Sequence, residues 1–189
     1  MDHVSLEMLQ KMKEAGCVHI GFGVESGSKQ ILENINKKIT ISQIKNAFAL
    51  AKKTGLRTKA FFMIGNIGEN SETIKETKKL LLEIMPDQMS ISRSVMIFPG
   101  TPLYYKVKRE GRLDDSVWIN DDKIVYDFEN SKEQMQRWQM GIMWMFHRKK
   151  GIVSFFLFAI QYLRVLPFKE LLKYLYLFVG KKEATGKKC

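Results

Sequence analysis

Hydrophobic residues recur at two spacings along the first 105 residues, and each spacing predicts a different element. Alternating or continuous apolar runs predict strands, whereas apolar residues three or four positions apart predict helices. Strands are expected at residues 18–24, 57–64 and 89–98, and helices at residues 5–15, 28–35, 40–55 and 71–85. Helices and strands therefore alternate, as they do in parallel βα units.

Three loops follow the expected strands, at residues 25–28, 65–70 and 99–102. In parallel βα folds, functional groups gather in the loops at the carboxyl ends of the strands, so we expect function there. Three strands are too few for a closed barrel or a comfortable open sheet. The chain is therefore expected to be part of something larger.

The pattern changes after residue 105. Residues 111–128 are irregular, with one possible strand at 123–128. Apolar and amphipathic helices are then expected at residues 131–150, 152–166 and 168–179, before a basic end at 180–189. The sequence thus divides into a βα part, residues 1–110, and a helical extension, residues 111–189.

Charge is concentrated in the last part of the chain. The net charge is +11, and residues 146–189 contribute +8 of it, from ten Lys and Arg against two acids. Three interpretations of this tail stay open: a helical appendage packed on the body, a pair of helices on an anionic membrane surface, or nucleic-acid binding. Nucleic acid is the least expected partner, because no basic stripe interleaved with aromatic residues is present.

Cysteine and histidine usage excludes several classes of site. Cys17 and Cys189 cannot form a disulfide framework, and the three histidines have no metal-ligand spacing, so no metal site and a cytoplasmic location are expected. The most apolar stretch, residues 152–163, is about half the ~20 residues of a spanning helix. Peripheral contact with a membrane surface is the alternative location.

The end of the first strand and the loop after it read Gly21-Phe-Gly-Val-Glu-Ser-Gly27. Its small residues would let a flat ligand approach, and the Glu25 carboxylate could accept hydrogen bonds from a ribose diol or an ammonium group. The dinucleotide fingerprint fails, because Ser26 stands where its third glycine is needed. The alternative is that Glu25 caps the helix that begins near Ser28.

The second and third loops also allow two interpretations each. Gly65 and Gly68 would offer bare backbone groups to a planar heterocycle, with Glu69 as a ligand. Alternatively, Glu69 is an acid in the first turn of the following helix. The segment Pro99-Gly-Thr-Pro102 is a rigid exit from the last strand, or an ordinary turn.

Together these motifs resemble a known family. In chain order they are Ala15-Gly-Cys17 with Phe22-Gly-Val-Glu-Ser-Gly-Ser28, Phe62-Met-Ile-Gly65 with Gly68-Glu69, and Phe98-Pro-Gly-Thr-Pro-Leu-Tyr104. The set resembles the second half of a radical S-adenosylmethionine (radical SAM) core domain, of the type that follows a cobalamin-binding domain. The resemblance covers residues 3–110, although the family usually has Gly-x-Pro-Gly-Glu-Thr where this chain has Gly65-Asn-Ile-Gly-Glu-Asn70.

The resemblance implies an α/β fold, a partial (βα)₆ barrel whose fourth, fifth and sixth strands this chain would supply. It places Glu25, Ser26 and Gly27 where the family contacts the ribose or methionine part of S-adenosylmethionine. Backbone groups around Gly65 would hold the adenine, and the residues implied are Ile64, Gly65, Asn66, Gly68 and Glu69. Arg93 and Ser94, on the last strand, would face the cofactor or substrate.

The family's Cys-x-x-x-Cys-x-x-Cys loop, which binds a [4Fe–4S] cluster, is absent from this sequence. We therefore expect a fragment of a radical SAM enzyme that contributes contacts to S-adenosylmethionine and to a substrate. It would be inactive unless an upstream polypeptide supplied the cluster half, and the parent protein could also carry cobalamin. The alternative is a non-catalytic module that binds S-adenosylmethionine or associates with a membrane.

Overall fold

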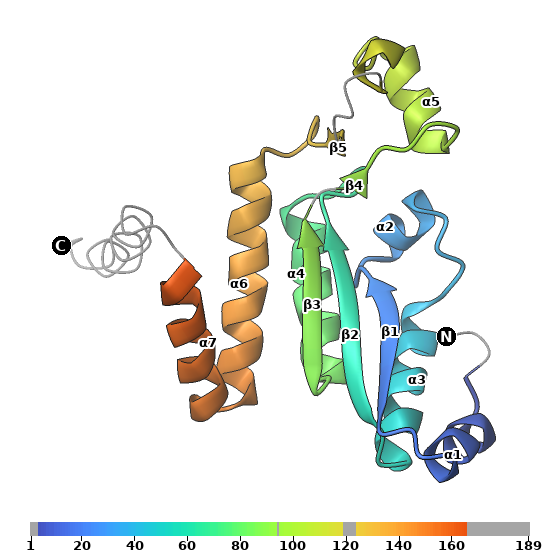
Figure 1. The fold of residues 1–189 in the computed structure, drawn as a ribbon, viewed down its shortest axis with the longest axis vertical. Coiled ribbons are helices and arrows are strands. Elements are labelled where there is room, and N and C mark those ends of the chain that lie inside the picture. The colour runs from blue at the N-terminus through green and yellow to red at the C-terminus, as the bar shows by residue number, and fades with distance from the viewer. Residues whose placement is uncertain (1–3, 94, 119–123, 166–189) are drawn as a thin grey trace, which may run out of the picture. The chain divides into compact units, whose positions relative to one another are not determined.

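A computed structural model describes residues 4–93, 95–118 and 124–165 of the chain. Its centre is a parallel sheet in the order β1-β2-β3, made of β1 (His19–Glu25), β2 (Arg57–Ile64) and β3 (Gln88–Arg93) (Figure 1). Ile20 pairs with Thr58, and Ala60 pairs with Met89. The expected α/β class with three parallel strands is confirmed.

Helices alternate with these strands, as the apolar spacing predicted. They are α1 (Leu6–Glu14), α2 (Lys29–Asn34), α3 (Ile41–Lys53) and α4 (Ser71–Ile84). The capping box at the start of α3 is present, because Thr40 accepts a hydrogen bond from the backbone of Gln43 and the Gln43 side chain accepts one in return.

The two faces of the sheet have different environments. Alternate residues of β2 are buried, from Thr58 to Ile64, and they form the main core with apolar residues of α3 and α4, such as Phe48 and Leu81. These helices lie on one side of the sheet in Figure 1. On the other side, Phe61 is 42% exposed and its ring lies over Gly21. Within the described part of the chain, α3 and α4 thus cover one face of the sheet, and Phe61 is exposed on the other.

The prediction of a single strand at residues 89–98 is wrong. After β3 ends at Arg93, the short strand β4 (Val95–Met96) pairs antiparallel with β5 (Val125–Tyr126), in a separate sheet. Ile97 then enters a second apolar cluster. The apolar residues after position 93 thus serve a second core, which an alternating pattern cannot distinguish from a longer strand.

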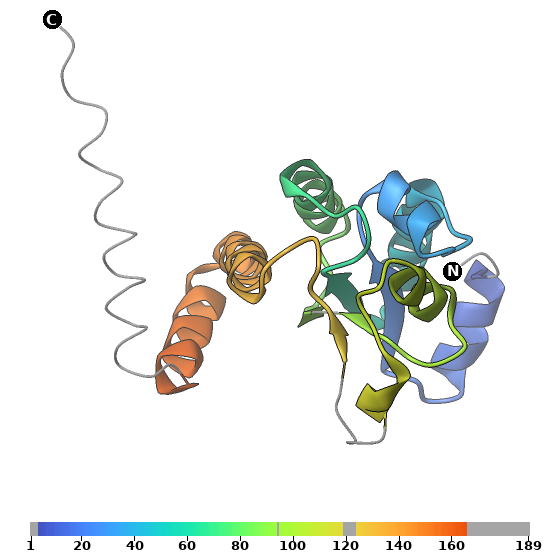
Figure 2. The same ribbon diagram turned by 90° about the horizontal axis from the view of Figure 1, so that it is seen from above.

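This second cluster, which we call the upper cluster, also contains a helix that the apolar spacing did not predict. Its buried members are Ile97, Tyr104, Val107, Leu113 and Tyr126. The helix is α5 (Pro102–Arg109), which begins after Thr101, whose side chain accepts a hydrogen bond from the Tyr104 amide. A short 3₁₀ turn, Asp115–Trp118, follows. Seen from above, α5 and β5 lie at the carboxyl ends of the parallel strands (Figure 2).

Two longer helices complete the described chain, α6 (Lys132–Lys150) and α7 (Ile152–Val165), as expected at residues 131–150 and 152–166. Met135 and Ile142 of α6 join the main core, and Gln139 Nε2 donates to the Ile91 carbonyl at 2.9 Å. The helix expected at 168–179 and the basic end at 180–189 lie outside the described residues.

Contacts divide the chain into two compact units, Met1–Phe146 and His147–Cys189. The domain boundary placed at residue 110 from the sequence stays a prediction.

Candidate functional site

The loops at the carboxyl ends of β1 and β2 bring most of the sequence-predicted site residues to one edge of the sheet. Glu25 ends β1, and residues 64–69 follow β2. Arg93 ends β3 with an exposed side chain, and it pairs in register with Ile64. Ser94 lies outside the described residues.

Glu25 lies at an irregularity in the sheet. The register shifts between Gly23 and Glu25, and Glu25 has a φ of 64°, in the left-handed region. Its carboxylate pairs with the ammonium group of Lys37 at 3.1 Å. Ser28 is the N-cap residue of α2, so Glu25 does not take that place. A carboxylate held at the end of a strand remains available to a polar ligand that displaces Lys37.

Ser26 and Gly27 are held by α4. Thr77 Oγ1 accepts the Gly27 amide at 2.9 Å and shares a hydrogen bond with Ser26 Oγ at 3.2 Å. A Cβ atom on Gly27 would lie 2.5 Å from the Thr77 Cα, so only glycine allows this approach of loop and helix. Both residues therefore position the loop that Glu25 begins.

The loop after β2 is folded around its own carboxylate. Glu69, which is 4% exposed, turns back so that its Oε2 accepts the Gly65 amide at 2.5 Å and the Asn66 amide at 3.2 Å. Its Oε1 has no hydrogen-bond partner among the described residues. Glu69 thus organises the loop instead of acting as an acid of the helix's first turn.

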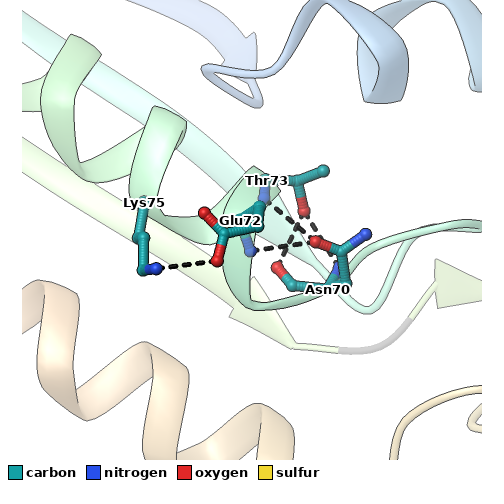
Figure 3. Close-up of polar contacts among 4 residues, drawn as sticks. All are labelled: Asn70, Glu72, Thr73 and Lys75. Carbon is teal, nitrogen blue, oxygen red and sulfur yellow. Dashed lines mark hydrogen bonds and ion pairs between the residues drawn. The ribbon is translucent and has the colours of Figure 1, made fainter.

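Helix α4 begins directly after this carboxylate. The Asn70 side chain accepts the amides of Glu72 and Thr73, and Thr73 Oγ1 accepts the Asn70 amide at 3.0 Å (Figure 3). Glu72 also pairs with Lys75 on the exposed side of the helix. This capping box fixes where the loop ends, so the segment from Gly65 to Glu69 is held at its carboxyl end by α4.

A cavity of about 710 Å³ opens beside this loop. Its walls come from the end of α2, the loop after β2, β4 and α5, and they include Met63, Ile67 and Met96. Asn66 also lines it, and the buried Asn66 Oδ1 has no hydrogen-bond partner among the described residues. The volume suits a small organic ligand, and a buried acceptor without a partner favours a ligand that donates a hydrogen bond there.

Comparison with known proteins shows which family the first part of the chain resembles. Residues 1–81 match the model of the Radical SAM superfamily. This part of the chain is therefore similar to radical SAM proteins. The chain is also 30% identical, over 109 residues, to the anaerobic magnesium-protoporphyrin IX monomethyl ester cyclase of Cereibacter sphaeroides, a match that covers 58% of this chain and 18% of that protein. The chain therefore spans about a fifth of the length of this relative.

Two solved structures share the fold. The radical S-adenosylmethionine methyltransferase TsrM from Kitasatospora setae aligns with a TM-score of 0.53 and 18% identity, over 57% of this chain and 22% of that chain. Coproporphyrinogen III oxidase (HemN) from Escherichia coli, a radical SAM enzyme, aligns with a TM-score of 0.52 and 18% identity, over 75% of this chain and 29% of that chain.

The residues present do not fit the [4Fe–4S] cluster of radical SAM enzymes. Such a cluster is held by cysteine thiolates, and this sequence has two cysteines, 172 positions apart. Cys17 lies just before β1, at the end of the sheet opposite the loops, where its Sγ is 3.3 Å from the His19 carbonyl. In the described part of the chain, no group of three His, Cys, Asp or Glu could hold a metal ion. No chemical step is therefore derived through a cluster.

Several residues of this candidate site were not found from the sequence. The two loops are bound by the side chains of Asn34 in α2, Lys37 in the segment between α2 and α3, and Thr77 in α4. Glu129 belongs to no motif in the sequence, yet its carboxylate accepts a hydrogen bond from the Gly68 amide, 61 positions away. The expectation that the extension packs on the βα part could have directed attention to Glu129, but it could not have indicated the other three residues, which lie in the βα part itself.

Burial raises the pKa of Glu69 from 4.5 to about 7, although the amides of Gly65 and Asn66 oppose the rise. The folded state therefore binds this proton more tightly than the unfolded chain does. The resulting stabilisation is complete below about pH 4.5 and is lost as the pH rises through about 7.

We predict that the free energy of unfolding falls by about 3 kcal/mol between pH 4.5 and 8, relative to a Glu69→Gln variant, which cannot ionise. Urea denaturation at several pH values measures the difference. Glu72→Gln, which changes an exposed carboxylate of α4, serves as the control. Parallel curves for the wild-type and Glu69→Gln chains would contradict the assignment of the raised pKa to Glu69.

Proposed function

We propose that this chain is the carboxyl-terminal half of a radical SAM core and that it supplies the nucleoside-binding part of an S-adenosylmethionine site. The observation that carries the proposal is the loop folded around Glu69, beside a cavity lined by the unpartnered Asn66 Oδ1. The exocyclic amine of adenine is a hydrogen-bond donor that Asn66 Oδ1 could accept. The apolar walls, including Met63 and Met96, suit the faces of a purine.

The remaining site residues extend the proposal to the rest of the ligand. Glu25 would accept hydrogen bonds from the ribose or from the methionine ammonium group, in exchange for Lys37. Arg93 and Ser94 would face S-adenosylmethionine or a substrate from the last strand. Ser26 and Gly27 would act through the position of the loop, since Thr77 holds both of them.

The chemistry of the family requires residues that this sequence does not contain. A [4Fe–4S] cluster supplies the electron that cleaves S-adenosylmethionine in radical SAM enzymes, and three cysteine thiolates hold it. We propose that a polypeptide carrying the Cys-x-x-x-Cys-x-x-Cys loop provides that half of the barrel. Cobalamin belongs to the proposal for the parent protein, because the TsrM structure contains cobalamin with its cluster.

We predict that S-adenosylmethionine binds the chain and that Asn66→Ala weakens binding about 5- to 30-fold, the effect of one lost hydrogen bond to a buried group. Glu25→Ala should weaken it by a similar or larger factor. Isothermal titration calorimetry measures both, with Asn46→Ala, on the exposed side of α3, as the control. Folded wild-type protein that binds no S-adenosylmethionine, or variants with unchanged affinity, would contradict the proposal.

A second candidate function, contact with an anionic membrane surface, is supported by α7. Its exposed apolar residues lie four positions apart or adjacent, and so occupy one helix face: Ile152, Val153, Phe156, Leu157 and Ile160. Arg148 and Lys149 are exposed just before this helix, and the sequence has no acid between Glu133 and Glu170. No helix among the described residues is long and apolar enough to cross a bilayer. A basic and apolar helix of this kind favours binding at the interface of anionic lipids.

We predict that the chain co-sediments with vesicles that contain phosphatidylglycerol, and less with pure phosphatidylcholine vesicles. A Phe156→Ser, Leu157→Ser double variant should reduce binding about tenfold or more, because two apolar side chains no longer enter the interface. Val18→Ser, which changes an exposed apolar residue near the sheet, is the control. Equal sedimentation with both kinds of vesicle would contradict the electrostatic part of this function.

A further inference from the structure

The peptide group between Ile67 and Gly68 is held at both of its polar atoms by side chains from outside the loop. Its carbonyl oxygen accepts a hydrogen bond from Asn34 Nδ2 at 2.8 Å. Its N–H donates to Glu129 Oε2 at 2.6 Å. A peptide group bonded on both sides cannot rotate without breaking both hydrogen bonds, so its orientation is fixed by the end of α2 and by the segment after β5.

Glu129 is itself held in place. Its Oε1 accepts the Tyr126 hydroxyl at 2.6 Å, and Tyr126 is 2% exposed within the upper cluster. The next residue, Asn130, donates from Nδ2 to the Glu69 carbonyl at 2.9 Å. The Ile67 side chain packs against the same cluster. Three consecutive residues of the loop after β2 are thus held from outside the loop: Ile67 by the upper cluster, Gly68 by Glu129, and Glu69 by Asn130.

The conformation of Gly68 makes this attachment important. Gly68 has a φ of 78°, and a Cβ atom there would lie 2.8 Å from Asn34 Nδ2. A glycine in this position is free to adopt several backbone conformations when nothing restrains it. Since Asn34 and Ile67 both line the cavity, the orientation of this peptide determines the shape of one cavity wall.

We propose that Glu129 is a positioning residue for the nucleoside-binding loop and acts through the Gly68 amide, with Asn34 as its counterpart on the opposite side of the peptide. This inference rests on the proposed function of the cavity. A hydrogen bond to a carboxylate is stronger than one between neutral groups, which suits Glu129 to this task. Without it, the loop samples other conformations, and the affinity falls with the fraction of the chain that remains competent to bind.

The test compares Glu129→Ala with Glu129→Gln. Glutamine can still accept the Gly68 amide with its oxygen and donate to the Tyr126 hydroxyl with its nitrogen. We expect Glu129→Ala to weaken S-adenosylmethionine binding about 5- to 20-fold, and Glu129→Gln to stay within about threefold of the wild type. Glu133→Ala, which removes an exposed carboxylate from the first turn of α6, is the charge-matched control.

Hydrogen exchange of single amides provides a measurement that does not depend on the ligand. In Glu129→Ala, the Gly68 amide should exchange at least about tenfold faster. The Gly65 amide, which Glu69 holds, should keep its rate. This comparison separates loosening of one peptide group from a general loss of stability.

The outcomes are distinct. Faster Gly68 exchange with unchanged affinity would show that Glu129 stabilises the loop without positioning it for a ligand, which overturns the proposal. Unchanged Gly68 exchange in Glu129→Ala would contradict the restraint itself. Absence of S-adenosylmethionine binding by the wild-type chain, with the restraint intact, would instead contradict the proposed function.

Discussion

The candidate site depends on the hydrogen bonds that the backbone amides of Gly65 and Asn66 donate to the buried carboxylate of Glu69. An ionised carboxylate loses favourable hydration when it is buried, and that cost is reduced only if nearby donors replace the water. The amides of Gly65 and Asn66 are those donors, so the loop must bend back over Glu69 to supply them. The same bend places Asn66 against the cavity and directs the chain into α4 at Asn70.

The rest of the fold supports this loop from both sides. Below it, the main core fixes β2 through alternate buried residues such as Phe62 and Ile64. Beside it, the upper cluster carries Tyr126, and through that residue Glu129. On the other face of the sheet, Phe61 of β2 is exposed among the residues that the structure describes. The conformation of the loop after β2 therefore depends on the packing of both apolar clusters.

Much of this fold could be predicted from the sequence, because its signals are local. The alternation in β2 and the capping box at Thr40 both depend on residues within a few positions of one another. The division of the strand expected at 89–98 could not be predicted, since apolar residues look alike whether they serve one core or two. Helix α5 was also not predicted, because the segment 99–102 was interpreted only as a turn or a rigid exit from the strand. Thr101 followed by Pro102 is nevertheless a typical helix start.

The candidate site divides in the same way. The glycines and acids of the two loops are local motifs, and the structure places both loops at the carboxyl edge of the sheet. The partners that hold these residues are distant in sequence. Lys37 binds Glu25 across 12 positions, Thr77 binds Gly27 across 50, and Glu129 binds Gly68 across 61. No residue pattern reports such contacts, because they depend on how the elements pack.

The most direct test of the account is to map S-adenosylmethionine onto the chain by nuclear magnetic resonance. We expect titration to shift the backbone amides of residues 65–69 and of Glu25 and Ser26 most strongly, with little change in α3. That result would place the ligand at the carboxyl ends of the strands, against the loop folded around Glu69. Shifts confined to other parts of the chain, with the amides of residues 65–69 unmoved at saturating ligand, would contradict the central claim.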